Sequence, residues 1–282
     1  MRLEARDRSR PKPEARSLDM TPDQLLDAST LLWDHWTGGR RLTAIPESIR
    51  PASREDGYAV QRLLEARSAG PLFGWKIAAT STAGQKHINV DGPLAGRLLA
   101  ERAFESGATV PFGHNHMRVA EAEFAFRMGR DLTPRWGPIT VGEALDATSS
   151  LHPAIEIPDS RFDDFTVVGA PQLIADNACA HYFVLGDAAP DSWREIDLIT
   201  HTVHGEVVGK AARDGIGANV LGDPRVALAW LANELSALGI TLRAGQVVTT
   251  GTCLVPLEIA PGDHVRMDFG VLGHVEARLA AL

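Results

Sequence analysis

The chain has 282 residues, of which 44% are hydrophobic and 23% are charged, a composition typical of a globular protein with a substantial core. Its net charge of -8 argues against nucleic acid as the main partner, because phosphate binding relies on clustered Lys and Arg, and a small ligand is expected instead. No apolar run approaches the ~18 residues that a membrane-spanning helix needs.

The first 17 residues are rich in arginine and lack the apolar stretch of a secretory signal, so residues 1–17 are predicted to be a mobile tail. A transit peptide is disfavoured because Glu4, Asp7 and Glu14 interrupt the basic run. Cys179 and Cys253 are too few for a disulfide framework. They indicate a reducing, cytoplasmic compartment and two buried thiols, although a single structural disulfide stays open.

Residues 18–72 are predicted to form a helical N-terminal portion. Thr21-Pro-Asp-Gln24 supplies an N-cap, a proline at the first helical position and a glutamine that can complete a capping box. This first helix is expected to end at Gly38-Gly39. A second helix is expected to begin at Ser53-Arg-Glu-Asp56 and to end near Gly70.

From residue 73 onward, short apolar runs separated by glycine, proline and aspartate predict strands. The expected strands are residues 73–79, 119–128, 151–157 and 178–185, with several more after residue 245. One helix interrupts them, beginning at Asp223-Pro224 and ending before Gly239. The C-terminal stretch is expected to be a string of hairpins with turns at 243–245, 261–263 and 270–273. These patterns predict an α+β fold, with a helical cap on a mostly β catalytic domain, residues 73–282.

Two glutamates of the predicted strand 119–128, Glu121 and Glu123, lie two residues apart and therefore point to the same face, roughly 7 Å apart. A third glutamate, Glu156, lies inside another apolar run. Carboxylates held close together repel one another unless a cation or water lies between them, and Mg²⁺ is usually held by one or two carboxylates with open positions left for substrate. The alternative is a solvated strand face with Arg127 as a partner.

Several stretches of the chain, in this order, together resemble the fumarylacetoacetate hydrolase superfamily and most closely its branch of 2-keto-4-pentenoate hydratases and 4-oxalocrotonate decarboxylases. The stretches are Gly74-Trp-Lys-Ile77, Thr80-Ser81, Glu121-Ala-Glu123, Ile155-Glu-Ile-Pro-Asp-Ser-Arg161, Ala175-Asp-Asn177, Trp230-Leu-Ala-Asn233, Ala244-Gly245, Thr250-Gly-Thr252 and Pro261-Gly-Asp263. The resemblance covers about residues 20–282. It implies a mixed β-roll with flanking helices.

The resemblance further implies a Mg²⁺ or Mn²⁺ ion held by Glu121, Glu123 and Glu156, and chemistry on 2-oxo acids. A 2-oxo acid can chelate such an ion through a carboxylate oxygen and its keto oxygen, and the ion then stabilises the negative charge that develops in the enolate. Lys76 matches the lysine of the family's Gly-x-Lys motif and is expected to move the proton. Burial beside a metal would lower its pKa. The alternative is a lysine at a strand end with its ammonium group in water.

Five further positions match the family's motifs and are predicted to bind substrate: Ser81, Arg161, Asp176, Asn177 and Thr252. Each has an alternative role. Arg161 could neutralise Asp159 or Asp163 instead of an anionic substrate, and Thr252 could serve only the turn. Asp176 and Asn177 could orient water or a metal ligand, or they could cap a helix or turn.

The resemblance implies a hydratase that adds water to a 2-hydroxy-2,4-dienoate such as 2-hydroxypenta-2,4-dienoate. One departure keeps decarboxylation of a 2-oxo-enedioate and C–C hydrolysis of an acylpyruvate open as alternatives. Leu94 stands where many hydratases of the family carry an acidic residue, and Asp91 could substitute for it. Analogy with the family also predicts a homo-oligomer and allows a complex with another enzyme of the pathway.

Overall fold

The structure is a computed structural model that describes residues 19–281, so the predicted tail, residues 1–17, lies outside the described residues. Helix α1 (Pro22–Gly38) begins as predicted, because the Thr21 hydroxyl accepts from the Gln24 amide and the Gln24 side chain accepts from the Thr21 amide at 2.9 Å. It ends at Gly39, whose φ of 62° is left-handed. Helix α2 (Arg54–Arg62) is shorter than predicted, and a 3₁₀ turn continues it over Leu63–Arg67.

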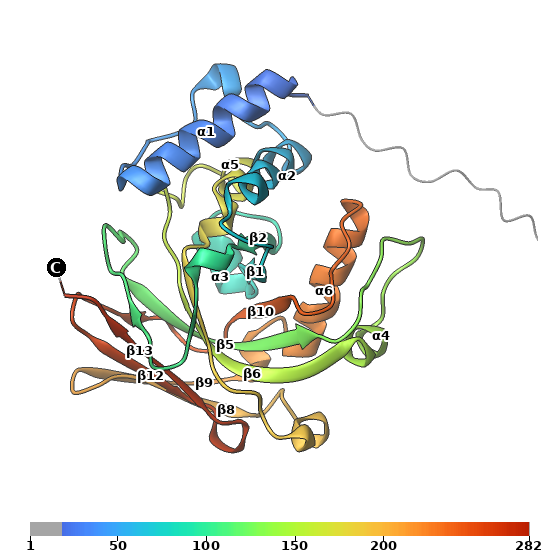
Figure 1. Cartoon of the computed structure of the whole chain (residues 1–282), viewed down its shortest axis with the longest axis vertical. Helices are drawn as coiled ribbons and strands as arrows, with labels where there is room; N and C mark the ends of the chain where they lie inside the picture. The colour runs from blue at the N-terminus through green and yellow to red at the C-terminus, as the bar shows by residue number, and fades with distance from the viewer. Residues whose placement is uncertain (1–18, 282) are drawn as a thin grey trace, which may run out of the picture.

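Within the described residues, the first sheet has eight strands in the order β2-β1-β10-β5-β6-β7-β3, with β11 paired to β5. Their bounds are β1 Gly74–Ala78, β2 Leu94–Leu98, β3 Ala103–Glu105, β5 Val119–Met128, β6 Thr148–Ile157, β7 Tyr182–Leu185, β10 Val247–Thr252 and β11 Leu257–Glu258. The sheet is mixed, because β1 runs parallel to β10 and antiparallel to β2. The long strands β5 and β6 curve strongly across its centre (Figure 1).

In the part of the chain that the structure describes, the second sheet has five strands in the order β4-β13-β12-β8-β9. Their bounds are β4 Thr109–Val110, β8 Thr202–Val207, β9 Ala211–Ile216, β12 His264–Asp268 and β13 His274–Leu279. The two sheets share a core, in which Phe124 of β5 packs edge-on against Phe269 with ring centroids 5.1 Å apart. Since side chains alternate along a strand, Phe124 faces the second sheet and the neighbouring glutamates face away from it. The curled mixed sheets and flanking helices confirm the predicted α+β class and β-roll.

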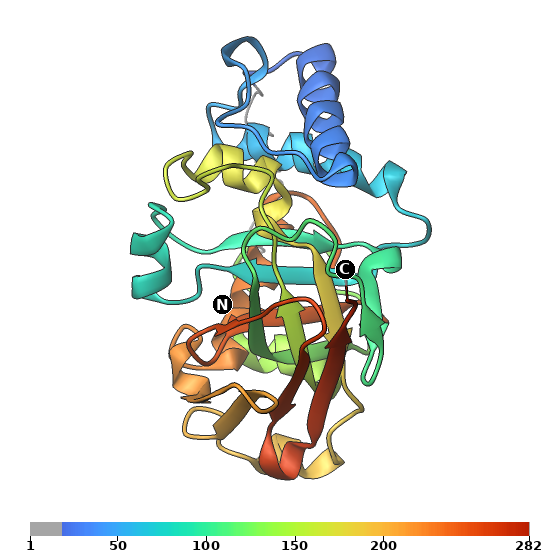
Figure 2. The ribbon, with the colours of Figure 1, turned by 90° about the vertical axis from the view of Figure 1, so that its left-hand side faces the viewer.

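Four further α-helices lie among the described residues and flank the sheets: α3 (Thr82–His87), α4 (Val141–Asp146), α5 (Ala170–Ala175) and α6 (Pro224–Ala237). Figures 1 and 2 show α1 and α2 beyond one end of the sheets, next to α5. Gln61 of α2 donates to the Ile174 carbonyl at 2.9 Å, and Gln172 of α5 accepts from the Ile45 amide at 2.9 Å. The N-terminal portion is thus hydrogen-bonded to α5, which belongs to the predicted catalytic domain. A domain boundary near residue 72 stays a prediction.

Two strand predictions were wrong in part. The apolar run 178–185 is a strand only over its second half, β7, because Asn177, Ala178 and Cys179 adopt left-handed backbone angles. The C-terminal string of hairpins is limited to β12 and β13, which pair antiparallel around the turn at Gly270. β10 instead inserts between β1 and β5 in the first sheet. Local turn signals do not reveal such distant partners.

In the part of the chain that the structure describes, every helix is too short or too polar to cross a membrane.

Candidate metal centre and active-site cavity

The structure brings the three predicted carboxylates together. Glu121 and Glu123 lie on β5, and the strand register places Glu156 of β6 directly opposite Glu121. One oxygen from each carboxylate lies within 4.8 Å of the others. Glu123 and Glu156 are fully buried, and Arg127 donates to the Gly245 carbonyl instead of pairing with them. A solvated strand face is therefore excluded.

Several buried oxygens of this cluster lack a hydrogen-bond donor. Glu123 Oε2 accepts from the Thr249 hydroxyl and, at 2.8 Å, from the Gly251 amide. Glu123 Oε1 and Glu156 Oε2 have no hydrogen-bond donor among the described residues, and Glu156 Oε1 has only the Lys76 ammonium, 3.0 Å away. Buried polar atoms are almost always partnered, and an unpartnered carboxylate is costly. Three convergent carboxylates with free oxygens fit a hard divalent cation such as Mg²⁺.

Mutual repulsion changes the titration of the cluster. Burial and the Glu156 charge raise the pKa of Glu121 to about 7, against the effect of Lys76. Burial, followed by the charges of Glu156 and Glu121, raises the pKa of Glu123 well above its usual range. The site therefore holds protons that a cation must displace.

We expect Mg²⁺ binding to weaken as the pH falls through about 7, because Glu121 must lose its proton to become a ligand. Without a cation, stability has the opposite pH dependence: a carboxyl with a raised folded-state pKa contributes stability that is lost as the pH rises through that pKa. In chelator, the midpoint of thermal unfolding should fall between about pH 6 and pH 8, and added Mg²⁺ should raise it more at the higher pH. Equal Mg²⁺ affinities at the two pH values, measured by calorimetry, would contradict this assignment.

Lys76 lies on β1 beside the carboxylates and is only 3% exposed. Its Nζ is 3.0 Å from Glu156 Oε1 and donates to the Ala178 carbonyl at 3.0 Å. Burial lowers the pKa of Lys76, as predicted, but the carboxylates of Glu156, Glu121 and Glu123 outweigh it and raise the pKa to about 12. The protein's own charges thus keep Lys76 an ammonium group, and a lowered pKa beside a bound metal stays a prediction. The alternative of a lysine with its head in water is excluded.

A strained turn holds the carbonyl that Lys76 contacts. Asn177, Ala178 and Cys179 have φ values of 56°, 50° and 61°, which are unfavourable for residues other than glycine. The Asn177 side chain fixes the turn, because it accepts from the Arg97 amide at 2.6 Å and donates to the Arg97 carbonyl at 2.9 Å. A Cβ at Gly96 would lie 2.5 Å from the Asn177 carbonyl oxygen and 3.0 Å from the Lys76 side chain. Gly96 therefore leaves room for both.

A cavity of about 1090 Å³ opens next to this cluster, and Lys76 and Glu121 form part of its wall. Ser81 and Thr252 line it, as their predicted role requires. Both hydroxyls also serve the chain itself: Ser81 accepts from the Gly84 amide at 3.0 Å to cap α3, and Thr252 donates to the Leu254 carbonyl at 2.8 Å. Substrate contact by these two residues stays a prediction.

Arg161, Asp176 and Asn177 do not line the cavity. Arg161 and Asp176 form a buried ion pair, and Asp176 Oδ2 accepts from the Ser160 hydroxyl at 2.8 Å. Burial raises the pKa of Asp176, while Arg161 opposes that rise. With its remaining donors on backbone carbonyls, Arg161 has no free group for substrate. The prediction that these three residues contact substrate is corrected: the pair joins residues 159–161 to the end of α5, and Asn177 fixes the strained turn.

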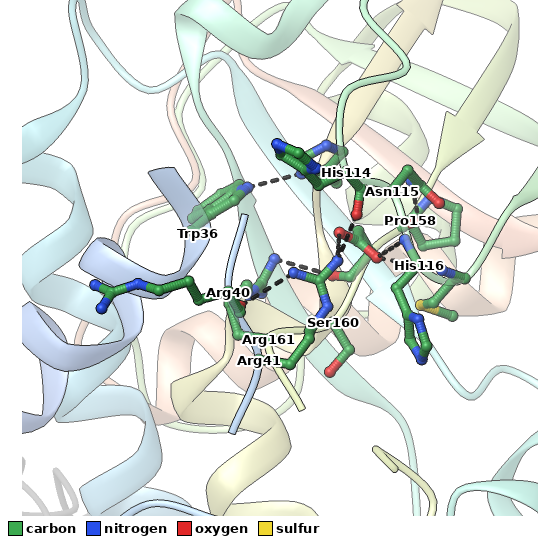
Figure 3. A network of polar contacts seen from close by, with 12 residues as sticks. Trp36, Arg40, Arg41, His114, Asn115, His116, Pro158, Ser160 and Arg161 are labelled. Carbon is green, nitrogen blue, oxygen red and sulfur yellow. Dashed lines mark hydrogen bonds and ion pairs between the residues drawn. The ribbon is translucent and has the colours of Figure 1, made fainter. Parts of the chain in front are cut away.

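The alternative role for Arg161, neutralising Asp159, is also wrong. Arg41 fills that role, with its Nη2 2.6 Å from Asp159 Oδ2, and Asp159 Oδ1 accepts from the His116 amide at 2.8 Å. Figure 3 shows this network, which joins the segment after α1 to residues 114–116 and 158–161. Asn115 completes it by donating to the Pro158 carbonyl at 2.9 Å. Since Pro158 lines the cavity, the network holds part of the cavity wall.

Asp91, the predicted substitute for the acidic residue that Leu94 replaces, lies away from the cavity. Leu94 begins β2, is fully buried and lines the cavity. Asp91 lies at the surface with its side chain 85% exposed, pairs with Arg54 at 3.2 Å and is not part of the cavity wall. Asp91 therefore does not supply the acid that Leu94 replaces.

Two residues that orient Glu123 are not among the predicted site residues. Thr249 of β10 donates to it, and Gly251 donates through its amide. Gly251 has φ +95°, and a Cβ there would lie 2.1 Å from the Thr80 hydroxyl oxygen. The glycine between two threonines was a detectable signal, but its partner depends on β10 pairing with β5.

The fold and the site define a curled β-roll protein with a candidate divalent-cation site beside a large cavity. Residues 100–280 match the family model described as fumarylacetoacetate (FAA) hydrolase C-terminal. This chain belongs to the fumarylacetoacetate hydrolase family.

Two relatives and one solved structure illustrate the similarity. The chain is 32% identical over 259 residues to a 2-keto-4-pentenoate hydratase of Paraburkholderia xenovorans (strain LB400), covering 91% of this chain and 95% of that protein. It is 34% identical over 244 residues to a 2-hydroxyhexa-2,4-dienoate hydratase of Comamonas testosteroni, covering 84% of this chain and 90% of that protein. The structure of 4-oxalocrotonate decarboxylase from Pseudomonas putida G7, complexed with magnesium and adipate, superimposes with a TM-score of 0.84 at 27% identity, covering 93% of this chain and 100% of that one.

Proposed function

We propose that this protein is a Mg²⁺- or Mn²⁺-dependent hydratase that adds water to a 2-hydroxy-2,4-dienoate such as 2-hydroxypenta-2,4-dienoate. The observation that carries the proposal is the convergence of three glutamate oxygens within 4.8 Å, with the ammonium of Lys76 3.0 Å from one of these glutamates, beside a cavity. The hydratase relatives, which match most of the chain, support the reaction. The magnesium bound by the structurally similar decarboxylase supports the choice of ion.

Glu121, Glu123 and Glu156 would hold the cation. When bound, the ion would supply Lewis-acid chemistry that offsets the negative charge developing on a 2-oxo acid. Lys76, held by Glu156 and the Ala178 carbonyl, is poised to give a proton to the terminal carbon of the dienol while the 2-hydroxyl loses its proton to water, which yields the conjugated enone. Water then adds at C4 of that enone, and C3 takes up a proton.

A second candidate function has one observation in its favour. The superposition with 4-oxalocrotonate decarboxylase extends over that whole chain, and the same carboxylate cluster could support decarboxylation or C–C cleavage. Product analysis separates the three reactions, because hydration yields a hydroxy-keto acid, decarboxylation yields carbon dioxide and acylpyruvate hydrolysis yields pyruvate.

The test of the proposal is the decay of the dienoate's ultraviolet absorbance in the presence of purified protein. We expect decay with Mg²⁺ or Mn²⁺, a hydroxy-keto acid as the product, and no decay in excess chelator until the ion is restored. Undiminished turnover in excess chelator would refute the proposal.

The proposal extends to a cytoplasmic homo-oligomer. Cys179 and Cys253 are both buried and unpaired, which supports a reducing compartment. The oligomer rests on analogy with the family alone.

A further inference from the structure

The cavity wall is poor in positive charge. Among the described residues that line it, only Lys76 and His87 can carry a positive charge, and neither arginine nor a second lysine is present. Much of the remaining wall is apolar, formed by Ile88, Leu94, Phe165, Leu173, Leu254 and Val255 among others. A ligand group that lies away from the glutamates therefore meets mostly hydrocarbon.

Neither of these two residues supplies a strong counter-charge to a ligand group far from the metal site. Lys76 is engaged by Glu156 and the Ala178 carbonyl, each at 3.0 Å. His87 is exposed at the end of α3, with its ring edge-on to Phe165 at 6.0 Å. An ion pair at such an exposed position contributes little, because water screens it.

The glutamate cluster also has no excess positive charge for a second carboxylate of the ligand. Three carboxylates are balanced by one lysine and one divalent cation, so the loaded site is neutral before substrate binds. The carboxylate at the 2-oxo end of a ligand can join the cation. A second carboxylate against the apolar wall would lose part of its hydration without gaining a counter-charge, which is unfavourable.

The volume of the cavity also favours a ligand with a long apolar chain. Cavities of roughly 300–1,000 Å³ accommodate drug-sized ligands, and this one has about 1090 Å³. A five-carbon acid would leave most of that volume to water. A longer apolar chain would instead bury its surface against the wall.

Building on the proposed function, we infer that this cavity selects 2-oxo and 2-hydroxy-dienoic acids that carry a single carboxylate and an extended, uncharged, apolar distal end, and that it discriminates against dicarboxylates of the same length. The determinants are the apolar wall and the missing counter-charge.

The first test is calorimetry of the Mg²⁺-loaded protein with two unreactive six-carbon ligands, 2-oxohexanoate and 2-oxohexanedioate. They share the 2-oxo acid group and differ only in a terminal methyl or carboxylate. We expect the monocarboxylate to bind at least about tenfold more tightly. Lengthening the monocarboxylate should strengthen binding roughly threefold for each added methylene. Equal binding of the pair, tighter binding of the dicarboxylate, or no gain with length would overturn the inference.

A variant that adds a positive charge at the cavity wall tests whether the missing counter-charge causes the selectivity. Val255 lines the cavity and is 68% exposed, so an arginine there adds a cation at the cavity wall without disturbing the core. Val255→Arg should shift the affinity ratio towards the dicarboxylate by roughly two- to fivefold, the range expected for an exposed ion pair. The control Val255→Gln adds a polar side chain without charge and should leave the ratio unchanged. Equal shifts in both variants, or none with arginine, would overturn the assignment to a missing counter-charge.

Turnover separates failure of this inference from failure of the proposed function. The substrates are 2-hydroxyhexa-2,4-dienoate and its dicarboxylate counterpart, 2-hydroxyhexa-2,4-dienedioate. Selective hydration of the first, with the higher kcat/KM, supports both proposals. Preferred turnover of the second would overturn the inference and leave metal-dependent catalysis standing. Selective binding of the monocarboxylate without hydration of either substrate would refute the proposed function and support the selectivity.

Discussion

Replacing Glu123 by glutamine is expected to abolish Mg²⁺-dependent turnover and to weaken Mg²⁺ binding by more than about 100-fold, since losing even an outer partner of a metal ligand costs about 10- to 100-fold. Glu123 is fully buried, and Thr249 and Gly251 orient one of its oxygens while the other has no donor. Glutamine keeps the shape but removes the charge, and its amide group can place N–H donors where a cation requires acceptors.

The same substitution should not unfold the protein. Removing one of three mutually repelling carboxylates should leave the midpoint of thermal unfolding in chelator unchanged or raised. The matched control is Glu258→Gln on β11, which makes the same charge change at an exposed position outside the cavity wall. Calorimetric titration measures the Mg²⁺ affinity of each variant. A wild-type Mg²⁺ affinity in Glu123→Gln would exclude Glu123 as a metal ligand.

Replacing Lys76 by methionine is expected to lower kcat by about 10²- to 10⁴-fold, the usual contribution of a positioned proton donor. Methionine retains much of the buried hydrocarbon chain. Mg²⁺ binding should be retained or tightened, because a positive charge 3.0 Å from Glu156 disappears. This combination of lost turnover and kept metal distinguishes a proton donor from a metal ligand or a purely structural residue.

Lys86→Met is the matched control for Lys76. Lys86 lies on α3, is exposed and is not part of the cavity wall, so its loss should leave kcat within about twofold of the wild-type value. Stopped-flow measurement of dienoate decay with saturating Mg²⁺ compares the three proteins. A Lys76→Met variant with near-normal kcat would exclude proton transfer by this residue.

Local signals predicted the features that depend on local chemistry. The two-residue spacing of Glu121 and Glu123 placed both on one face of β5, and the capping residues around Thr21 fixed the start of α1. Glu156 was different: its position inside another apolar run made it a candidate, but spacing could not show that it lies opposite Glu121, because the register between β5 and β6 is a long-range property.

The predictions that the structure corrects also depended on contacts between residues far apart in the sequence. Arg161 and Asp176 looked like ligand-binding groups, but the turn after β6 and the end of α5 bring them together as a buried pair. The pKa of Lys76 is predicted to fall through burial beside a metal, whereas the three carboxylates that the fold brings next to it outweigh burial. The left-handed turn at Asn177 was hidden within an apolar run, since its support comes from Arg97 in a distant strand.

The central claim is that Glu121, Glu123 and Glu156 hold one divalent cation to which a 2-oxo acid binds. A crystal structure with Mn²⁺ and oxalate, with anomalous scattering used to locate the metal, tests it most directly. The prediction is one Mn²⁺ peak at about 2.0–2.3 Å from an oxygen of each glutamate, with two oxalate oxygens completing the coordination and the cavity extending beyond them. A metal peak elsewhere, or glutamates that remain without metal while oxalate binds at another place, would contradict it.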